Sequence, residues 1–325
     1  MNSRERFNQA MAYGVVDRVP YFEEGIREEV AAAWRRQGLP PGADLAQLFP
    51  SDPREEIVVD LEPRPELARW PSTAADLADF RNSLDPRDPG RFPSDWQRQI
   101  QTWQGDDAVR MLRIHRGFFL TMGVRTWPRF REVMDLLFDA PDLVREIMAV
   151  QGEFAAEMAE HVLSQTPVEA AIFSEPIGGN DRPLMSPHMY EDLVLPGYRP
   201  VMEVLNRHAV RTLILRTFAN ARALIPSFLK AGFNCLWACE VNIAAMDYRN
   251  MRREFGTELR LIGGIDTDAL RRGKEAIRRE IEEKVPPLLA DGGYVPLADG
   301  RVREDVPFDN YVYYRNLLAE VIRKR

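Results

Sequence analysis

Residues Thr212–Arg216 read TLILR, a run of four apolar or β-branched side chains that ends on an arginine. An unbroken run of this kind is typical of a strand buried on both faces, as strands of parallel sheets are. Comparable runs occur at Arg18–Phe22, Val109–Ile114, Val168–Phe173, Asn234–Ala238, Leu259–Gly263 and Tyr294–Leu297, with Glu56–Leu61 as a further candidate. The sequence therefore predicts a set of short, buried, parallel strands.

The segments between these runs have helical periodicity. Apolar side chains recur on one helical face from Leu270 to Leu288, and Ser186-Pro187 is a typical helix start before Met189–Leu205. Strands alternating with amphipathic helices predict the α/β class, and we expect a (β/α)8 TIM barrel. The 325 residues fit a single barrel domain over 1–325 with additions.

The stretch from about 38 to 93 departs from this pattern. It is rich in Pro, Asp and Arg, and its hydrophobic periodicity is weak. We interpret it as an insertion over one end of the barrel. A lid and an irregular surface excursion remain equally open interpretations of it.

Composition and charge exclude several classes of protein. The net charge of −7 argues against a nucleic-acid partner, which requires a basic face. No apolar run is long enough to span a membrane, and Met1–Arg6 lacks the apolar stretch of a signal peptide. Two cysteines, Cys235 and Cys239, are too few for a disulfide framework, so we expect a cytoplasmic protein.

Ionisable side chains follow most of the predicted strands. Active sites of (β/α)8 barrels lie at the carboxyl ends of the strands, so these side chains are candidate site residues. We predict catalytic roles for Glu175, Glu240 and Arg216. The predicted substrate-binding residues are Glu24, His115, Arg116, Asn180, Asn220, Asp266, Asp299 and Arg301. All of them are expected to converge on one cavity.

This mixture of carboxylates and arginines suits a small anionic substrate. Arginine binds carboxylate or phosphate through a planar fork, and a nearby carboxylate can act as acid or base. Structural roles remain open for the same residues. Arg216 could pair with Glu175 or Glu240, Asp266 could cap the following helix, and His115 could be a satisfied core histidine.

The sequence favours no metal site. On a strand, Cys235 and Cys239 would stand about 13 Å apart, too far to share one zinc ion. The favoured interpretation is that both are small buried residues, although Cys239 could bind a metal together with Glu240. The chain also lacks a phosphate-binding P-loop, a dinucleotide-binding glycine motif after a strand and a nucleophile elbow.

Several motifs, in order, resemble those of the uroporphyrinogen decarboxylase superfamily, which holds decarboxylases and corrinoid-linked methyltransferases. They are Ser3–Phe7, Asp17–Pro20, Pro183–Pro187, Leu195–Tyr198, Met246-Asp247, Phe255-Gly256, Gly263–Asp266, Gly292–Pro296 and Asp305–Tyr311. The resemblance implies a barrel enzyme and, since members of the superfamily often dimerise, a homodimer.

Three departures from the superfamily patterns narrow the reaction. True uroporphyrinogen decarboxylases have an arginine-rich segment where this chain has the acidic Tyr21–Gly25. Zinc-dependent methyltransferases have a His-x-Cys motif where this chain has Arg216–Phe218, and a His or Cys where it has Asp299–Arg301. The resemblance therefore places the chain closer to the methyltransferase branch, without zinc.

Three functions follow as hypotheses. The first is zinc-independent transfer of a methyl or other one-carbon group, with a corrinoid protein or tetrahydrofolate as co-substrate and no tightly bound cofactor. In it, Glu175 and Glu240 are the acid/base groups and Arg216 anchors the substrate. The second is decarboxylation of an aromatic or tetrapyrrole-like acid. The third is a ligand-binding barrel without catalytic activity.

Overall fold

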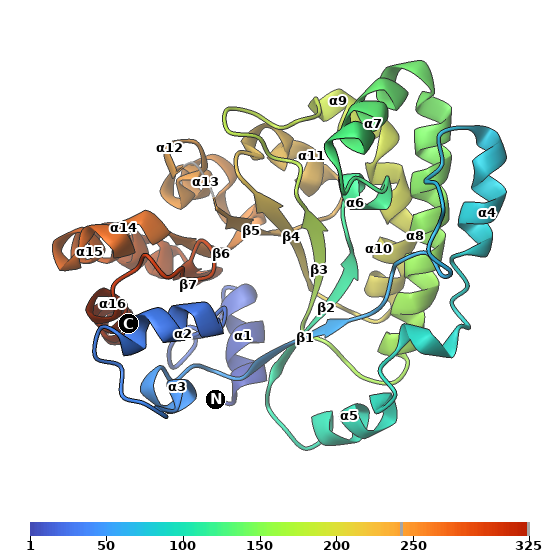
Figure 1. Cartoon of the computed structure of the whole chain (residues 1–325). Helices are drawn as coiled ribbons and strands as arrows, with labels where there is room; N and C mark the ends of the chain where they lie inside the picture. Colours follow the sequence, from blue (N-terminus) through green and yellow to red (C-terminus); the bar gives the residue numbers. More distant parts are fainter. Residues whose placement is uncertain (241–242, 324–325) are drawn as a thin grey trace. The chain divides into compact units, whose positions relative to one another are not determined.

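The computed structural model describes residues 1–240 and 243–323, which form two compact units. The first unit comprises Met1–Arg54, Asp107–Val109 and Cys235–Arg325. The second comprises Glu55–Asp106 and Arg110–Asn234. The elements of both units are labelled in Figure 1. That the whole chain forms one barrel domain stays a prediction.

Four strands of the second unit lie side by side in chain order. They are β1 (Arg54–Val58), β2 (Val109–His115), β3 (Ala170–Glu175) and β4 (Thr212–Phe218). The pairs β2–β3 and β3–β4 are parallel, and the register of β2 shifts at a bulge near its carboxyl end. The predicted runs in this unit are thus strands, with β3 and β4 extending further toward their carboxyl ends than expected.

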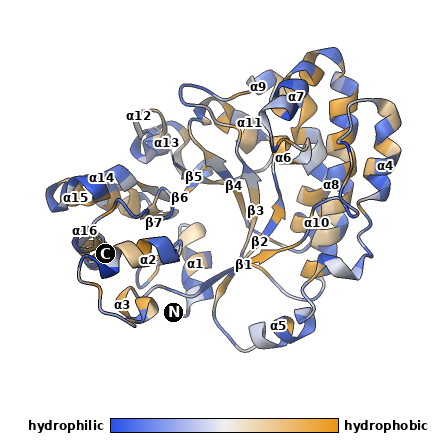
Figure 2. Ribbon diagram, viewed as in Figure 1, coloured by the Kyte–Doolittle hydropathy of each residue, from blue (hydrophilic) through white to orange (hydrophobic). Residues whose placement is uncertain are grey.

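Helices of the second unit follow its strands. They are α4 (Leu77–Asn82), α5 (Trp96–Trp103), α6 (Phe118–Thr121), α7 (Trp127–Asp139), α8 (Pro141–Leu163), α9 (Pro187–Leu193), α10 (Leu195–Arg207) and α11 (Ile225–Lys230), with 3₁₀ turns at Ala74–Asp76, Pro89–Arg91 and Arg222–Leu224. Ser186 caps α9 as predicted, but the single helix expected over Met189–Leu205 is divided between α9 and α10. Figure 2 shows both hydrophobic and hydrophilic residues on helices such as α4 and α8, as expected for amphipathic helices.

The two long helices α8 and α10 approach each other through glycine. A Cβ atom added at Gly152 of α8 would lie 1.8 Å from the carbonyl oxygen of Gly197 in α10. The helices pack this closely because neither backbone carries a side chain at the contact. The next residue of α10, Tyr198, contacts the ring of Phe173 in β3. This packing fixes the helical layer against one face of the sheet.

The sheet of the second unit curls strongly. In a flat sheet, β1 and β4 would lie about 14 Å apart, since adjacent strands are spaced by about 4.8 Å. Nevertheless, Arg216 of β4 forms an ion pair with Glu56 of β1. These side chains meet because the sheet bends toward the face on which they lie. Curvature of this kind is typical of strands that belong to a barrel.

The first unit contains three strands, which lie in the order β5 (Cys235–Cys239), β6 (Arg260–Ile265) and β7 (Tyr294–Ala298). The pairs β5–β6 and β6–β7 are parallel. Its helices are α1 (Ser3–Met11), α2 (Glu28–Arg35), α3 (Leu45–Leu48), α12 (Ile243–Met246), α13 (Tyr248–Phe255), α14 (Thr267–Arg272), α15 (Lys274–Asp291) and α16 (Phe308–Arg323), with a 3₁₀ turn at Gly256–Glu258.

The prediction of a strand at Arg18–Phe22 is wrong. Val19, Tyr21 and Phe22 are buried, yet the segment forms no strand. Asp52 takes the place of a strand partner: its carboxylate accepts the Tyr21 backbone N–H at 2.8 Å, and its own backbone N–H donates to the Tyr21 carbonyl at 2.8 Å. Arg18 holds the same carboxylate through two contacts of 2.6 Å. An apolar run is therefore buried here without a ladder.

The described residues thus form an α/β protein with seven strands, mostly parallel. The predicted insertion at 38–93 is not one piece, because the chain passes from the first unit to the second at Arg54-Glu55 and forms β1 there. No helix among the described residues is long and apolar enough to cross a membrane.

The close contact of α8 and α10 generates a prediction. Gly152→Ala should lower the free energy of unfolding by about 1–3 kcal/mol, because the new methyl group forces the helices apart and outweighs the better helix propensity of alanine. Gly105→Ala is the control, since its nearest non-neighbour atom is the Thr102 carbonyl oxygen at 3.9 Å. Urea unfolding measures both variants, and equal stability of the two would contradict the packing described here.

Candidate functional site

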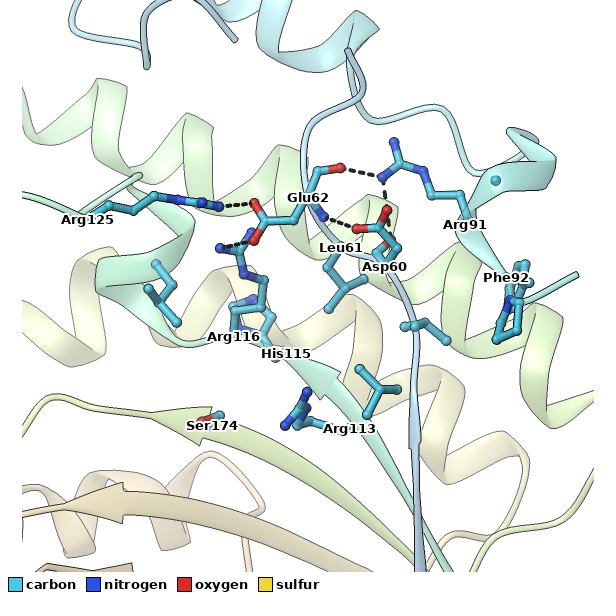
Figure 3. Close-up of a pocket in the computed structure, with 15 residues that line it drawn as sticks. Asp60, Leu61, Glu62, Arg91, Phe92, Arg113, His115, Arg116, Arg125 and Ser174 are labelled. Carbon is cyan, nitrogen blue, oxygen red and sulfur yellow. Dashed lines mark hydrogen bonds and ion pairs between the residues drawn. The ribbon is translucent and has the colours of Figure 1, made fainter. Parts of the chain in front are cut away.

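A cavity of about 810 Å³ lies in the second unit near the carboxyl ends of β1 and β2. Its lining residues are Val58–Glu62, Gly90–Pro93, Arg113, His115, Arg116, Leu120, Arg125 and Ser174. Figure 3 shows the charged side chains gathered around it. Part of the predicted insertion, at 58–62 and 90–93, therefore borders this cavity, and its interpretation as a lid stays a prediction.

One end of the cavity is built around Glu62. Its carboxylate forms ion pairs with Arg116 and Arg125, each at 2.6 Å, so that each oxygen binds one guanidinium group. The Arg116 and Arg125 side chains come from residues just before and just after α6. Burial lowers the pKa of the Arg116 guanidinium, and the nearby Glu62 carboxylate offsets part of the cost of burying this charge.

The sheet face beside the cavity carries a second charged group. Glu56 of β1 binds Arg216, and Arg113 of β2 lies 3.8 Å from the same carboxylate. Ser174 of β3 pairs in register with Arg216 and so lies on that face. Arg216 thus pairs with Glu56, a carboxylate that the sequence analysis did not offer as its partner.

The lining of the cavity is positive. It includes the four arginines Arg91, Arg113, Arg116 and Arg125, but only two carboxylates, Asp60 and Glu62. Arginine-lined clefts attract anions, because the walls screen charge less than bulk water does. The cavity can therefore hold a small molecule that carries carboxylate or phosphate groups.

Glu175 lies on the opposite face of β3 from Arg216. It pairs in register with Thr217, and successive strand residues point to opposite faces. The Glu175 carboxylate is fully buried, where it accepts hydrogen bonds from Tyr198 Oη, from Tyr190 Oη at 2.8 Å and from the Phe118 backbone N–H at 3.0 Å. Burial raises its pKa.

The expectation that Glu175 and Arg216 point into one cavity is therefore wrong. The three hydrogen bonds to Glu175 connect β3 with α6, α9 and α10, which is the pattern of a positioning residue. A catalytic role for Glu175 stays an untested prediction.

His115 borders the cavity, and its ring packs on the same side of the sheet as Glu175. The ring stacks on Phe173 with centroids 5.8 Å apart and contacts Tyr198 at 4.3 Å. Burial lowers the pKa of His115 to about 3, with the nearby Arg116 charge as the second cause. The Gly117 backbone N–H donates to Nδ1 at 3.0 Å, so the proton of the neutral ring resides on Nε2.

Two predicted amide residues lie on loops that follow β3 and β4. Asn220 Nδ2 donates to the Asp181 carbonyl at 2.8 Å, and Asn220 Oδ1 accepts the Arg222 backbone N–H at 3.1 Å. The amide is thus engaged in joining the two loops. Asn180 is exposed at the neighbouring loop tip. Neither residue lines the 810 Å³ cavity.

The other predicted residues belong to the first unit. Glu240, Asp266, Asp299 and Arg301 line a cavity of about 240 Å³. Asp266 caps α14 by accepting the Asp268 backbone N–H, so its structural interpretation is confirmed.

Glu240 and its neighbours show how this smaller cavity is held. Glu240 has a positive φ of 49°, a conformation often found at functional sites, and binds Arg303. Asp299 accepts the Thr267 backbone N–H at 3.1 Å. Glu24 binds Arg54 at 2.8 Å, and its carbonyl accepts a hydrogen bond from Arg301.

Metal-ligating side chains do not cluster in the part of the chain that the structure describes: no group of three or more His, Cys, Asp or Glu residues there could hold an ion. Cys235 and Cys239 are buried and form no disulfide. Burial raises the pKa of the Cys235 thiol to about 12, which makes it unreactive near neutral pH.

Sequence reasoning found His115 and Arg116 but missed most of the charged cavity residues. Glu62 follows the candidate strand Glu56–Leu61, so the rule applied to the other strand ends would have identified it. Arg113 interrupts an apolar run in β2, which is the sign of a side chain that faces a polar cavity. Arg91 and Arg125 carry no such signal, because neither of them follows a predicted strand.

A family model described as Uroporphyrinogen decarboxylase (URO-D) matches residues 122–296, more than half of the chain. The chain belongs to the uroporphyrinogen decarboxylase family. This family includes decarboxylases and methyltransferases, so membership is consistent with either reaction. Among curated proteins, none matches this chain.

The match to the uroporphyrinogen decarboxylase family covers only part of the cavity. Of the lining residues, Arg125 and Ser174 lie within residues 122–296, whereas the lining contributed by 58–120 lies outside them. The matched region thus contains α7 to α15, β3 to β6 and the beginning of β7. The charged residues Glu62 and Arg116 belong to the part of the cavity that the family match does not cover.

The buried imidazole of His115 generates a prediction on pH. The unfolded chain binds a proton near pH 6.5, whereas folded His115 does so only near pH 3, so the folded state loses stability as the pH falls between these values. His115 therefore contributes a slope of about 1.4 kcal/mol per pH unit to the free energy of unfolding. In urea unfolding between about pH 6 and pH 5, His115→Asn should remove this contribution to the slope.

The control for this measurement is His188→Asn, which removes an exposed histidine from α9. It should leave the pH slope of the wild-type protein unchanged. An unaltered slope in His115→Asn would mean that the folded protein protonates His115 in this range.

Proposed function

We propose that this protein is a zinc-independent one-carbon transferase that moves a methyl group to or from a small anion held in the 810 Å³ cavity. The observation that carries the proposal is the excess of arginine over carboxylate in the cavity of a uroporphyrinogen decarboxylase family member. The lack of a metal-ligating cluster among the described residues supports a route without a zinc-activated thiol. A corrinoid protein or tetrahydrofolate would supply or accept the methyl group.

Within this proposal, Arg116 and Arg113 anchor the anion, and Glu56 holds Arg113 in place. Fixing an anion in this way lowers the entropic cost of bringing it to its reaction partner. Arg216 acts through Glu56 and is a positioning residue. Glu240 stays a candidate acid or base, and Asp299 and Arg301 stay candidate substrate-binding residues.

Decarboxylation is the second candidate. It is favoured by the same guanidinium groups, because a planar fork binds a carboxylate through two parallel hydrogen bonds. In this reaction an arginine would hold one carboxylate of the substrate, and a neighbouring group would protonate the carbon from which carbon dioxide leaves. The family includes both reactions, so only activity separates them.

We further propose that the complete chain forms the (β/α)8 barrel that its family implies. The curl of the four-stranded sheet in the second unit and the parallel strands of both units support it. A homodimer is the corresponding proposal for its oligomeric state, which sedimentation would test.

The proposed function predicts methyl transfer in a direct assay. The purified protein is incubated with methylcobalamin or 5-methyltetrahydrofolate and a panel of small aromatic and aliphatic acids. A change in corrinoid absorption together with a methylated product is the expected result. Release of carbon dioxide without methylation would establish the decarboxylase instead. Ligand-induced thermal stabilisation without either product would indicate a binding protein.

Arg116→Ala should raise KM for the anionic substrate roughly 10- to 100-fold, because a hydrogen bond to a charged group contributes about 1.5–3 kcal/mol. We expect a smaller effect on kcat, since Arg116 anchors rather than reacts. Arg98→Ala, which removes an exposed arginine from α5, is the matched control and should behave like the wild-type protein. An unchanged KM in Arg116→Ala would place the substrate elsewhere.

A further inference from the structure

The Glu62 carboxylate occupies the position that a bound anion would take. Its two oxygens each accept one guanidinium group, Arg116 on one side and Arg125 on the other, at 2.6 Å. Figure 3 shows a contact from each of the two arginine side chains to the Glu62 carboxylate. A ligand carboxylate or phosphate bound by two arginines requires the same arrangement of donors. Glu62 is therefore a chemical equivalent of such a ligand group, supplied by the chain itself.

The contact is easily exchanged. The Glu62 side chain is 40% exposed and that of Arg125 is 50% exposed, so water screens their attraction. Arg116 is different, with an exposed fraction of only 17% and a pKa lowered by burial. Its charge needs an anionic partner, but that partner can be Glu62 or the anionic group of a ligand.

The backbone of Glu62 is held separately from its carboxylate. The Glu62 N–H donates to Asp60 Oδ1 at 2.9 Å, and the Glu62 carbonyl accepts a hydrogen bond from Arg91. Arg91 is buried and also donates to the Ser83 carbonyl at 2.8 Å. The side chain of Glu62 can therefore rotate away from the arginines while its segment keeps these hydrogen bonds.

From these observations, we propose that Glu62 is a tethered competitor, which neutralises the Arg116–Arg125 site in the empty protein and gives way to the anionic group of a ligand. This rests on the proposed function only in taking the cavity as the substrate site. Because every anion must displace Glu62, ions that bind through one weak contact are excluded. Glu62 thus sets the affinity and the selectivity of the site.

A purely structural role for Glu62 makes the opposite prediction. If the carboxylate served only to hold Arg116 and Arg125 in place, its removal would loosen both guanidinium groups and weaken the binding of anions. If Glu62 competes, its removal vacates a formed site and strengthens binding. The sign of the change in affinity therefore distinguishes the two roles.

The experiment measures anion affinity by titration calorimetry in the full-length protein, with inorganic phosphate and benzoate as probes. Glu62→Gln should bind them about five- to tenfold more tightly than the wild-type protein, the change expected on removing two competing ion pairs of this exposure. Glu66→Gln is the matched control, because it removes the same charge from an exposed position on the same segment. Its affinity should stay within about twofold of wild type, since screened charges act weakly at a distance.

Two further variants secure the interpretation. Glu62→Gln combined with Arg116→Ala should lose the gain, which places the anion at the same arginine. If Glu62→Gln fails to fold, Glu62→Asp provides the test, because its side chain is one methylene shorter and cannot bind both arginines fully; it should also bind anions more tightly than wild type.

The proposal is overturned if Glu62→Gln binds both probes no more tightly than Glu66→Gln does. This readout does not involve turnover, so it is independent of the assay for methyl transfer. If the affinity rises but neither methylation nor decarboxylation is detected, the tethered competitor is supported and the proposed function is not. If the protein is active but the affinity does not rise, the proposed function is supported and the tethered competitor is not.

Discussion

The ion pair between Glu56 and Arg216 is the constraint on which the second unit depends. It joins the first and fourth strands of a sheet across its inner face, which requires the sheet to curl. Charged side chains so little exposed need partners, and Arg113 lies beside the same carboxylate. The curl and the positive lining of the cavity therefore have one cause, since the curved sheet brings these charges together beside the space in which an anion can bind.

The strands that run through the core could be predicted because burial on both faces leaves an unbroken apolar run. β2 and β4 begin at the predicted residues, Val109 and Thr212. The run at Arg18–Phe22 is just as apolar, but Asp52 satisfies its backbone instead of a neighbouring strand. Apolar sequence reports burial, and burial does not require a ladder. The closure of a barrel depends on long-range pairing, which no local pattern contains.

The candidate site was predicted in part, for reasons of geometry. His115 and Arg116 were found because His115 ends β2 and Arg116 follows it directly. Glu175 was misplaced because β3 extends to it, and the alternation of side chains then turns Glu175 toward the helices and Ser174 toward the inner face. The strand-end rule identifies the end of the sheet but not the face. Register decides the face, and a single sequence does not reveal register.

The buried network behind the sheet also bears on the cavity. Glu175 accepts the backbone N–H of Phe118, the first residue of α6, and a Cβ atom at Gly117 would lie 2.8 Å from the same carboxylate. The turn from β2 into α6 is thus pressed against Glu175 and can accommodate only glycine at this point, where φ is +84°. Arg116 precedes this turn. The fully buried Glu175 carboxylate, on one face of the sheet, therefore fixes the backbone from which the Arg116 side chain reaches Glu62 on the other face. Precise placement of the cavity charges therefore originates in the hydrophobic layer, where hydrogen bonds are strongest and water does not compete.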